Sequence, residues 1–348
     1  MLKTVSIFRS NLLHGKTAIV SGGSTGIGYN IAKELMDLGC HVIIASRSEE
    51  RLKNATEELR RNRNGNGSGS GSDGVPNGAV DYYRTDIREP NDVKALMSYA
   101  VDTFGGSVDY LVNNGGGQFP SAAEELSENG WNAVINTNLN GTFRMCREAV
   151  LTGKMQENGG SIVNIICTHF QGFPGMAHTG AARAGVDNLT KTLASEWASF
   201  GIRVNSVAPG VIYSQSAEGN YSNKQKHPNN QFERYLSSQA PRIPFRRLGT
   251  TQEVSNVVTF LLSPGGSYTS GSTYVMDGAF TCSGGVGSDT FLRRTKKPPR
   301  EAFPFDGYLP DFCIAEDDRV AVMASAETDI QEEIHALELK LAALRLKK

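Results

Sequence analysis

The chain has 348 residues, of which 39% are hydrophobic, and its formal net charge at pH 7 is −1. This length accommodates one large domain or two small ones, with a buried core. A nearly neutral chain gives no electrostatic reason to expect nucleic acid or an anionic membrane surface as a partner. Five scattered cysteines without metal-ligand spacing predict no metal site and favour a reducing intracellular compartment. No apolar run approaches the roughly 18 residues that a membrane span needs.

The first predicted element is a buried strand, residues 17–21, followed by a Gly/Ser-rich loop and a helical pattern. This order exposes backbone N–H groups and a helix N-terminus where a pyrophosphate binds. The glycines are spaced by three residues and then one, unlike the usual dinucleotide fingerprint, and a plain glycine-rich turn is the alternative. We predict a nucleotide site that is formed by Gly22, Ser24, Thr25, Gly26, Ile27 and Gly28.

A second buried strand, residues 41–46, ends in Ser46 and Arg47. A site for NAD places a carboxylate here, because the ribose 2′-hydroxyl needs an acceptor. A hydroxyl and a guanidinium instead suit the 2′-phosphate of NADP(H). The end of this strand therefore predicts NADPH as the cofactor, with a solvated helix start as the alternative reading of Arg47.

After a charged helix over residues 49–61, residues 62–78 are almost wholly Gly, Ser and Asn, which predicts a surface loop. Strand 80–84 then leads to Asp86 and Ile87, where an acid is positioned to contact an adenine. Strand 110–112 ends in the run from Asn113 to Gly117. Such a run exposes backbone at the carboxyl edge of a sheet, where ligands of α/β folds bind. We assign to the cofactor site Asp86, Ile87, Asn114, Gly115 and Gly116.

Strands alternate with helices seven times up to about Gly278. This alternation predicts an α/β, Rossmann-type, doubly wound parallel sheet of about seven strands with helices on both faces. The predicted domains are an N-terminal arm (1–15), a cofactor-binding domain (16–280), an irregular tail (281–324) and an amphipathic C-terminal helix (325–348). Apolar residues in that last segment recur at heptad spacing, which is typical of docking or weak self-association.

The motif series of residues 14–280 resembles the short-chain dehydrogenase/reductase superfamily. The residues that carry this resemblance are Ser21–Gly28, Asp86, Asn113–Gly116, Asn138, Ala208–Gly210 and Asp277-Gly278. The runs 113–119, 180–186 and 208–215 look like those of peroxisomal trans-2-enoyl-CoA reductases, and 2,4-dienoyl-CoA reductases are similar at greater distance. The resemblance implies a homo-oligomer in the peroxisome. The chain ends in Leu346-Lys347-Lys348 instead of the Ser-Lys-Leu address, so the mitochondrion and the cytoplasm stay open.

The resemblance breaks at the catalytic positions. The superfamily places a Tyr four residues before a Lys, and here these positions hold Thr179 and Arg183, while the Ser position falls at Cys167 or Thr168. An alcohol dehydrogenase needs the phenol to exchange a proton with the substrate oxygen, and a threonine hydroxyl is far too weak an acid. Reduction of an enoyl thioester instead needs donors at the thioester oxygen, where an enolate charge develops. The departure therefore favours carbon–carbon double bonds as the target.

By the same resemblance, Arg183 binds the nicotinamide ribose, Thr179 donates to the thioester oxygen or holds a water, and Asn138 supports the catalytic helix. The second-rank candidates are Asn140, Cys167 and His169. The cofactor residues beyond the fifth strand are Pro209, Gly210, Ile212 and Ser214. Three of these residues also have a purely structural interpretation. Arg183 could be a solvated helix residue, Asn138 could only satisfy backbone hydrogen bonds, and His169 could be an ordinary loop residue.

Residues 213–248 lie where this superfamily folds its substrate cover. They hold six Lys or Arg residues and two Glu residues, a local excess of four positive charges. Coenzyme A carries three phosphate groups, which such a cover would attract. We therefore expect a fatty acyl-CoA substrate and an NADPH-dependent trans-2-enoyl-CoA reductase. The alternatives are a 2,4-dienoyl-CoA reductase and a catalytically silent NADP-binding protein.

Overall fold

A computed structural model describes residues 7–65, 78–214 and 231–283 of the chain. The chain divides into two compact units, residues 1–220 with 249–277 and residues 221–248 with 278–348. The second unit includes helix α9 (Gln231–Gln239) and a 3-10 turn (Ala240–Arg242). Most of the predicted loop 62–78, residues 215–230 of the predicted cover, and nearly all of the predicted tail and C-terminal helix lie outside the described residues.

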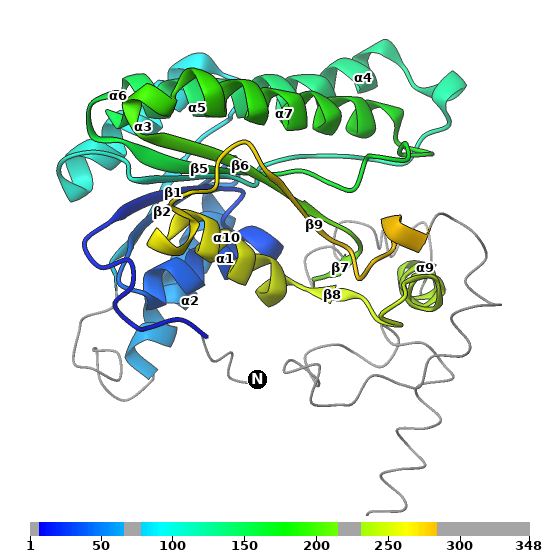
Figure 1. Ribbon diagram of the computed structural model, residues 1–348, viewed down its shortest axis with the longest axis horizontal. Helices are drawn as coiled ribbons and strands as arrows, with labels where there is room; N and C mark the ends of the chain where they lie inside the picture. Colours follow the sequence, from blue (N-terminus) through cyan, green and yellow to red (C-terminus); the bar gives the residue numbers. More distant parts are fainter. Residues whose placement is uncertain (1–6, 66–77, 215–230, 284–348) are drawn as a thin grey trace, which may run out of the picture. The chain divides into compact units, whose positions relative to one another are not determined.

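Seven parallel strands form the central sheet in the order β3-β2-β1-β4-β5-β6-β9 (Figure 1). The strands are β1 (Thr17–Ser21), β2 (His41–Ser46), β3 (Val80–Arg84), β4 (Tyr110–Asn113), β5 (Gly160–Ile165), β6 (Ile202–Pro209) and β9 (Thr273–Met276). The strand order reverses between β1 and β4, so their carboxyl ends flank the crevice where ligands of doubly wound sheets bind. The predicted doubly wound fold is confirmed.

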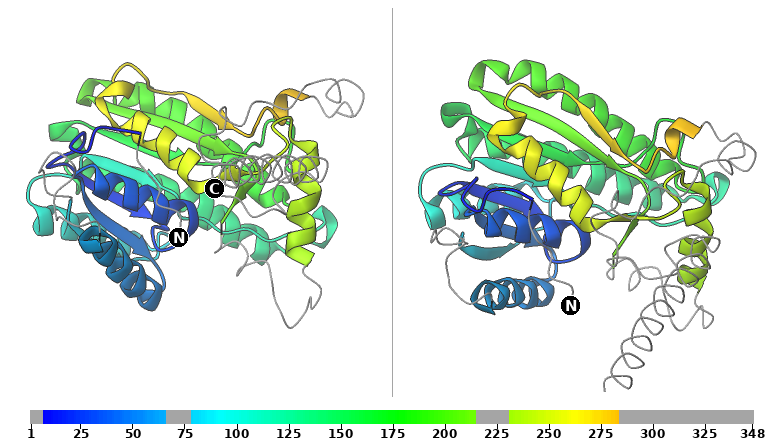
Figure 2. Two further views of the ribbon diagram at one scale, coloured as in Figure 1. Left: turned by 90° about the horizontal axis from the view of Figure 1, so that it is seen from below. Right: turned by 60° about the horizontal axis from the view of Figure 1, so that its bottom comes forward.

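Helices cover both faces of the sheet. One face carries α1 (Gly26–Asp37), α2 (Glu49–Gly65) and α10 (Thr251–Leu262), and the other carries α3 (Pro90–Phe104), α4 (Glu128–Ile135), α5 (Gly141–Leu151), α6 (Met155–Asn158) and α7 (Ala177–Glu196) (Figure 1). The turned views in Figure 2 show the same two layers, with α1 and α10 side by side. Among the helices of the described ranges, none is long and apolar enough to cross a membrane.

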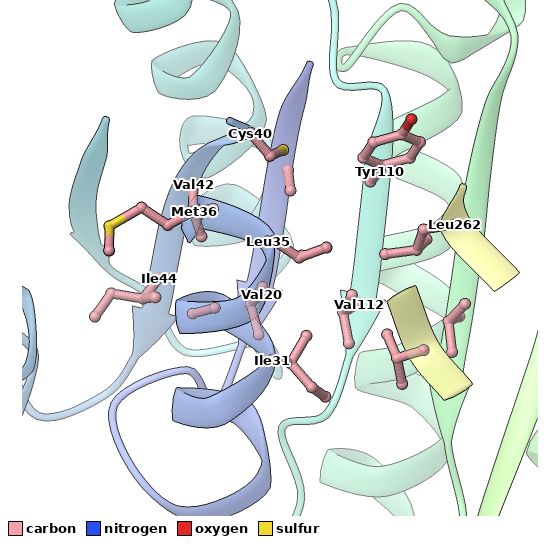
Figure 3. Packing of buried hydrophobic residues seen from close by; sticks show 14 of the residues in the cluster. Val20, Ile31, Leu35, Met36, Cys40, Val42, Ile44, Tyr110, Val112 and Leu262 are labelled. Carbon is pink, nitrogen blue, oxygen red and sulfur yellow. The ribbon is translucent and has the colours of Figure 1, made fainter. Parts of the chain in front are cut away.

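The alternation of side chains along each strand feeds two separate cores. On β1, Ala18 and Val20 face α1 and α10, whereas Ile19 joins the core beneath α3, α5 and α7. Figure 3 shows the first core, in which Ile31 and Leu35 of α1 pack over the strands. Each fully buried aliphatic side chain contributes about 1.5–3 kcal/mol relative to an exposed one. Both faces of the sheet are therefore buried, which explains the continuous apolar strands.

One row of polar side chains crosses the sheet inside the second core. Asn113, Asn164 and Ser206 are register partners on β4, β5 and β6. The amide of Asn113 donates to Asn164 Oδ1 (2.9 Å), and the amide of Asn164 donates to Thr190 Oγ1 of α7 (2.9 Å). Thr190 Oγ1 also lies 2.7 Å from Ser206 Oγ. The row links three strands to α7 just below the carboxyl edge.

One predicted boundary is wrong, and two local features have no counterpart in the sequence expectations. Helix α2 continues to Gly65, four residues into the predicted loop. A π-helical turn, Asn136–Asn140, interrupts the long helical segment between α4 and α5. A short parallel pair, β7 (Ile212–Tyr213) with β8 (Gly249–Thr250), lies between β6 and β9 in the chain and forms a separate two-stranded sheet. Such π-turns are rare single-turn features inside α-helices, frequently found at functional sites.

Candidate cofactor and catalytic site

The loop after β1 has the geometry of an anion site. Helix α1 begins at Gly26, its N-cap Thr25 makes no side-chain capping bond, and its first turn holds no acidic residue. The first N–H groups of α1 therefore remain available, and the helix dipole favours a negative charge there. Gly22 and Gly26 both have positive φ angles, 66° and 58°, which suit glycine. A Cβ on Gly28 would meet the carbonyl oxygen of Gly22, so this helix packs closely on the loop.

The loop after β4 is fastened to the loop after β1. Ser21 Oγ accepts the backbone N–H groups of Asn114 (3.1 Å) and Gly115 (2.9 Å). The Asn114 amide donates to the carbonyl oxygens of Ser21 and Gly22, at 3.2 Å each. Asn114 is thus held by the glycine loop, and Ser21, which the sequence reasoning named only as part of the family motif, has a role in this site. These hydrogen bonds tie together the loops at the carboxyl ends of β1 and β4.

The predicted adenosine end lies beside β2 and β3. Ser24 Oγ is 3.5 Å from Ser46 Oγ, and Arg47 is exposed just beyond β2. The Asp86 carboxylate is held by Arg88, which lies only two residues away, at 2.5 Å between Nη2 and Oδ2. That hydrogen-bonded guanidinium, helped by the charge of Arg47, lowers the pKa of Asp86 from its usual value. The side chain of Ile87, the next residue, packs against the Cα of Gly141, where a Cβ would not fit.

The π-helical turn holds two of the predicted site residues, Asn138 and the second-rank candidate Asn140, in different surroundings. Asn138 is buried, and its Oδ1 accepts the N–H of Gly117 while its Nδ2 donates to the Gly117 carbonyl oxygen, both at 2.9 Å. The whole amide of Asn138 therefore holds the loop after β4. Asn140 is exposed and lines a hollow of about 370 Å³ with Phe143 and Arg144, so it does not join the other site residues.

Arg183 is the buried cation at the centre of the site. Only 8% of its surface is exposed, and its Nη1 has no hydrogen-bond partner among the described residues. A Cβ on Gly116 would overlap Nη2 and come within 3.1 Å of Asn138 Oδ1, so the guanidinium lies directly against this glycine. Burial lowers the pKa of Arg183 from its usual value. An arginine keeps its charge even so, which leaves a cation with unused donors.

Cys167 and His169 follow β5 on the same edge. The Cys167 thiol is half-buried, and this burial raises its pKa to about 11, although the charge of Arg183 acts in the opposite direction. The thiol is therefore protonated at neutral pH. His169 stacks on Phe170, with ring centroids 4.4 Å apart, and its buried Nε2 has no partner among the described residues.

Thr179 and its neighbour His178 form a buried pair at the start of α7. His178 Nδ1 accepts the backbone N–H of Thr179 (2.8 Å) and lies 3.3 Å from Thr179 Oγ1. Because Nδ1 is an acceptor, the hydroxyl must be the donor in that contact, and its oxygen lone pairs remain for a ligand. The ring of His178 meets Phe119 edge-on at 4.6 Å. Sequence reasoning assigned no role to His178, and its place directly before the tyrosine position was the available signal.

The last predicted cofactor residues follow β6. Pro209 is the buried final residue of β6, and the Gly210 N–H donates to the Met276 carbonyl oxygen (2.9 Å). A Cβ on Gly210 would come within 2.7 Å of Asp277 Cβ, which fixes the close approach of this loop to β9. Ile212 pairs with Gly249, and Ser214 ends the described range.

Comparisons with known proteins identify one matching family and related enzymes. The family described as "Enoyl-(Acyl carrier protein) reductase" matches residues 22–281. The chain is 38% identical, over 78% of its length and 86% of the relative's, to a peroxisomal 2,4-dienoyl-CoA reductase of Rattus norvegicus. It is 36% identical, over 76% of its length and 95% of the relative's, to a probable 2,4-dienoyl-CoA reductase of Bacillus subtilis (strain 168).

Among solved structures, an actinorhodin polyketide ketoreductase with NADPH superposes with a TM-score of 0.66 at 32% identity, covering 76% of this chain and 97% of that one. The strand order, the glycine loop and these matches lead to one conclusion. The chain belongs to the short-chain dehydrogenase/reductase superfamily, as an oxidoreductase of the enoyl reductase kind.

Proposed function

We propose that this chain is an NADPH-dependent reductase that saturates the 2,3-double bond of trans-2-enoyl-CoA thioesters in fatty acid metabolism. The observation that carries the proposal is the presence of Thr179 and Arg183 at the two catalytic positions of the superfamily. The tyrosine position holds a buried threonine whose proton faces His178, and the lysine position holds a buried cation with an unused donor. This arrangement lacks the acid that carbonyl reduction needs, and it supplies the charge that an enolate oxygen needs.

The residues at the carboxyl edge fit NADP(H). The uncapped N-terminus of α1, with Gly22, Ser24, Thr25, Gly26, Ile27 and Gly28, would hold the pyrophosphate. Ser46 and Arg47 would take the 2′-phosphate, while Asp86 and Ile87 would border the adenine. The residues that would surround the nicotinamide end are Asn114, Gly115, Gly116, Arg183, Pro209, Gly210, Ile212 and Ser214. When bound, NADPH supplies the hydride that adds to the β-carbon of the substrate.

The chain's own side chains divide the remaining work. Arg183 would bind the nicotinamide ribose and would offer its unpartnered Nη1 to the developing charge. The Thr179 oxygen, with its proton held by His178, accepts from a water that protonates the α-carbon. Asn138 positions Gly117 and, through it, the loop after β4. The protonated thiol of Cys167 is a further donor, whereas Asn140 and His169 have no part in the proposal.

Recognition of the acyl-CoA is assigned to the basic segment 213–248. Arg234, Arg242, Arg246 and Arg247 of this segment lie among the described residues. The charge excess suits the phosphates of coenzyme A. A homo-oligomeric state and a peroxisomal location complete the proposal, supported by the superfamily resemblance and by the peroxisomal relatives.

A 2,4-dienoyl-CoA reductase is the second candidate, favoured by the names of the relatives. Both reactions need the same support at the thioester oxygen, so the site geometry serves either. The deciding experiment mixes pure protein and NADPH with matched enoyl-, dienoyl- and ketoacyl-CoA esters and follows the loss of reduced nicotinamide. Turnover of the enoyl ester supports the proposal, and turnover of the dienoyl ester alone favours the second candidate. Turnover of only the ketoacyl ester refutes both, and tight NADPH binding without any turnover indicates a silent binding protein.

A further inference from the structure

At the adenosine end of the site, Asp86 forms an ion pair with Arg88, a residue that has no part in the scheme above. Arg88 donates to Asp86 through three contacts: Nε to Oδ1 (2.9 Å), Nε to Oδ2 (3.1 Å) and Nη2 to Oδ2 (2.5 Å). The backbone N–H of Arg88 also reaches Asp86 Oδ1 (3.0 Å). Both carboxylate oxygens are therefore engaged by one residue, in the bidentate geometry that binds a carboxylate most tightly.

The position of this pair relates it to the cofactor's phosphate. Residues 46 and 84 are register partners on β2 and β3, and the N–H of Thr85 donates to the Ser46 carbonyl oxygen (2.9 Å). Asp86 therefore stands next to Arg47, whose charge acts on its carboxyl group. An unpaired carboxylate in this place would repel a 2′-phosphate dianion and attract Arg47 away from it.

We propose that Arg88 is a specificity-determining residue, which selects NADPH over NADH by neutralising Asp86 beside the 2′-phosphate site of Arg47. This inference rests on the proposed use of NADPH. The pair keeps Asp86 in place to border the adenine, a contact that both cofactors share. The neutralised charge matters only to the cofactor that carries the additional phosphate.

The test measures dissociation constants for NADPH and NADH by calorimetry on the full chain, without any acyl-CoA. Arg88→Gln removes the charge and keeps a hydrogen-bonding amide. An uncompensated carboxylate at this partly exposed position should weaken NADPH binding by roughly tenfold and change NADH binding by less than about twofold. The double variant Asp86→Asn with Arg88→Gln removes both charges, so the ratio of the two constants should return close to that of the wild type.

Arg147→Gln is the matched control, because Arg147 is also an arginine next to its carboxylate partner, Glu148, at 2.6 Å on α5. It should leave both constants unchanged, and thermal melting checks that each variant is folded. An Arg88→Gln protein that keeps the wild-type ratio overturns the inference and leaves the proposed function standing. A double variant that stays as weak toward NADPH as Arg88→Gln also overturns it, because Arg88 would then bind the phosphate itself. A wild-type protein that binds neither cofactor overturns the proposed function together with this inference.

Discussion

The close contact between Gly116 and Arg183 gives the sharpest test of the proposed chemistry. The substitution Gly116→Ala adds one methyl group where the guanidinium of Arg183 now lies. The backbone of Gly116 is outside the left-handed region, so alanine brings no conformational penalty of its own. The guanidinium must instead move by about 1 Å to regain ordinary van der Waals separation. The perturbation therefore acts mainly on the position of one cation, and the Asn138 amide, whose Oδ1 would lie 3.1 Å from the new methyl group, needs to shift by only a few tenths of an ångström.

The size of the effect follows from that displacement. A shift of about 1 Å in a group that stabilises a transition state can cost roughly 100-fold in rate. Complete removal of one such donor costs about 100- to 1,000-fold. We therefore expect kcat/KM for the enoyl-CoA ester to fall by about 10- to 100-fold in Gly116→Ala, equal to about 1.4–2.7 kcal/mol of transition-state stabilisation. The free energy of unfolding should change by less than about 1 kcal/mol.

Steady-state kinetics with saturating NADPH and varied concentrations of the enoyl-CoA ester measure this loss in kcat/KM, and Gly117→Ala is the matched control. A Cβ on Gly117 meets nothing within 4 Å, so this neighbouring substitution should leave the rate within about twofold. Adding Arg183→Lys to Gly116→Ala should restore part of the rate, because the ammonium is more compact than the guanidinium. A Gly116→Ala enzyme as fast as the wild type would refute the placement of Arg183 at the reacting centre.

Four further outcomes are expected. Arg47→Asp should move the preference toward NADH by about tenfold or more, measured as the ratio of dissociation constants, because a carboxylate repels the 2′-phosphate. Thr179→Val should slow turnover by at least about tenfold while leaving NADPH affinity within about twofold, and an unchanged rate excludes the hydroxyl. Alkylation of Cys167 by iodoacetamide, followed by mass spectrometry, should be slow at neutral pH and rise toward about pH 11, because burial raises the pKa of its thiol. Arg203→Met should lower the free energy of unfolding by about 1–3 kcal/mol in urea titrations, because Arg203 donates to the carbonyl oxygens of Leu262, Gly266 and Thr269.

The fold could be predicted from the sequence because its signals are local. Buried β-branched runs such as residues 17–21, followed by Gly22, and residues 41–46, which end in Ser46, indicate strands that end at a ligand-binding edge. Their order along the chain then determines the topology. The superfamily was also recognisable, since its motifs recur at successive strand ends, and the family match confirms it.

The site could be predicted only in outline, because its details depend on partners far apart in the chain. Asn138 and Asn140 are two residues apart, and only the π-helical turn decides that one faces Gly117 and the other lines a surface hollow. The contact between His178 and Thr179 depends on a rotamer at the start of α7. The pairing of Arg88 with Asp86 gave no sequence signal, because charged neighbours are common in solvated turns.

The polar row through Asn113, Asn164, Thr190 and Ser206 explains how β4, β5 and β6 keep their register. A one-residue slip of β5 would turn Asn164 to the opposite face and leave its former partners buried without hydrogen bonds, at about 1–3 kcal/mol for each group. Hydrogen bonds inside the sheet therefore determine where β4, β5 and β6 end relative to one another, and so where their loops begin. Substitutions in those loops can then alter which substrate is accepted while the reacting groups stay aligned.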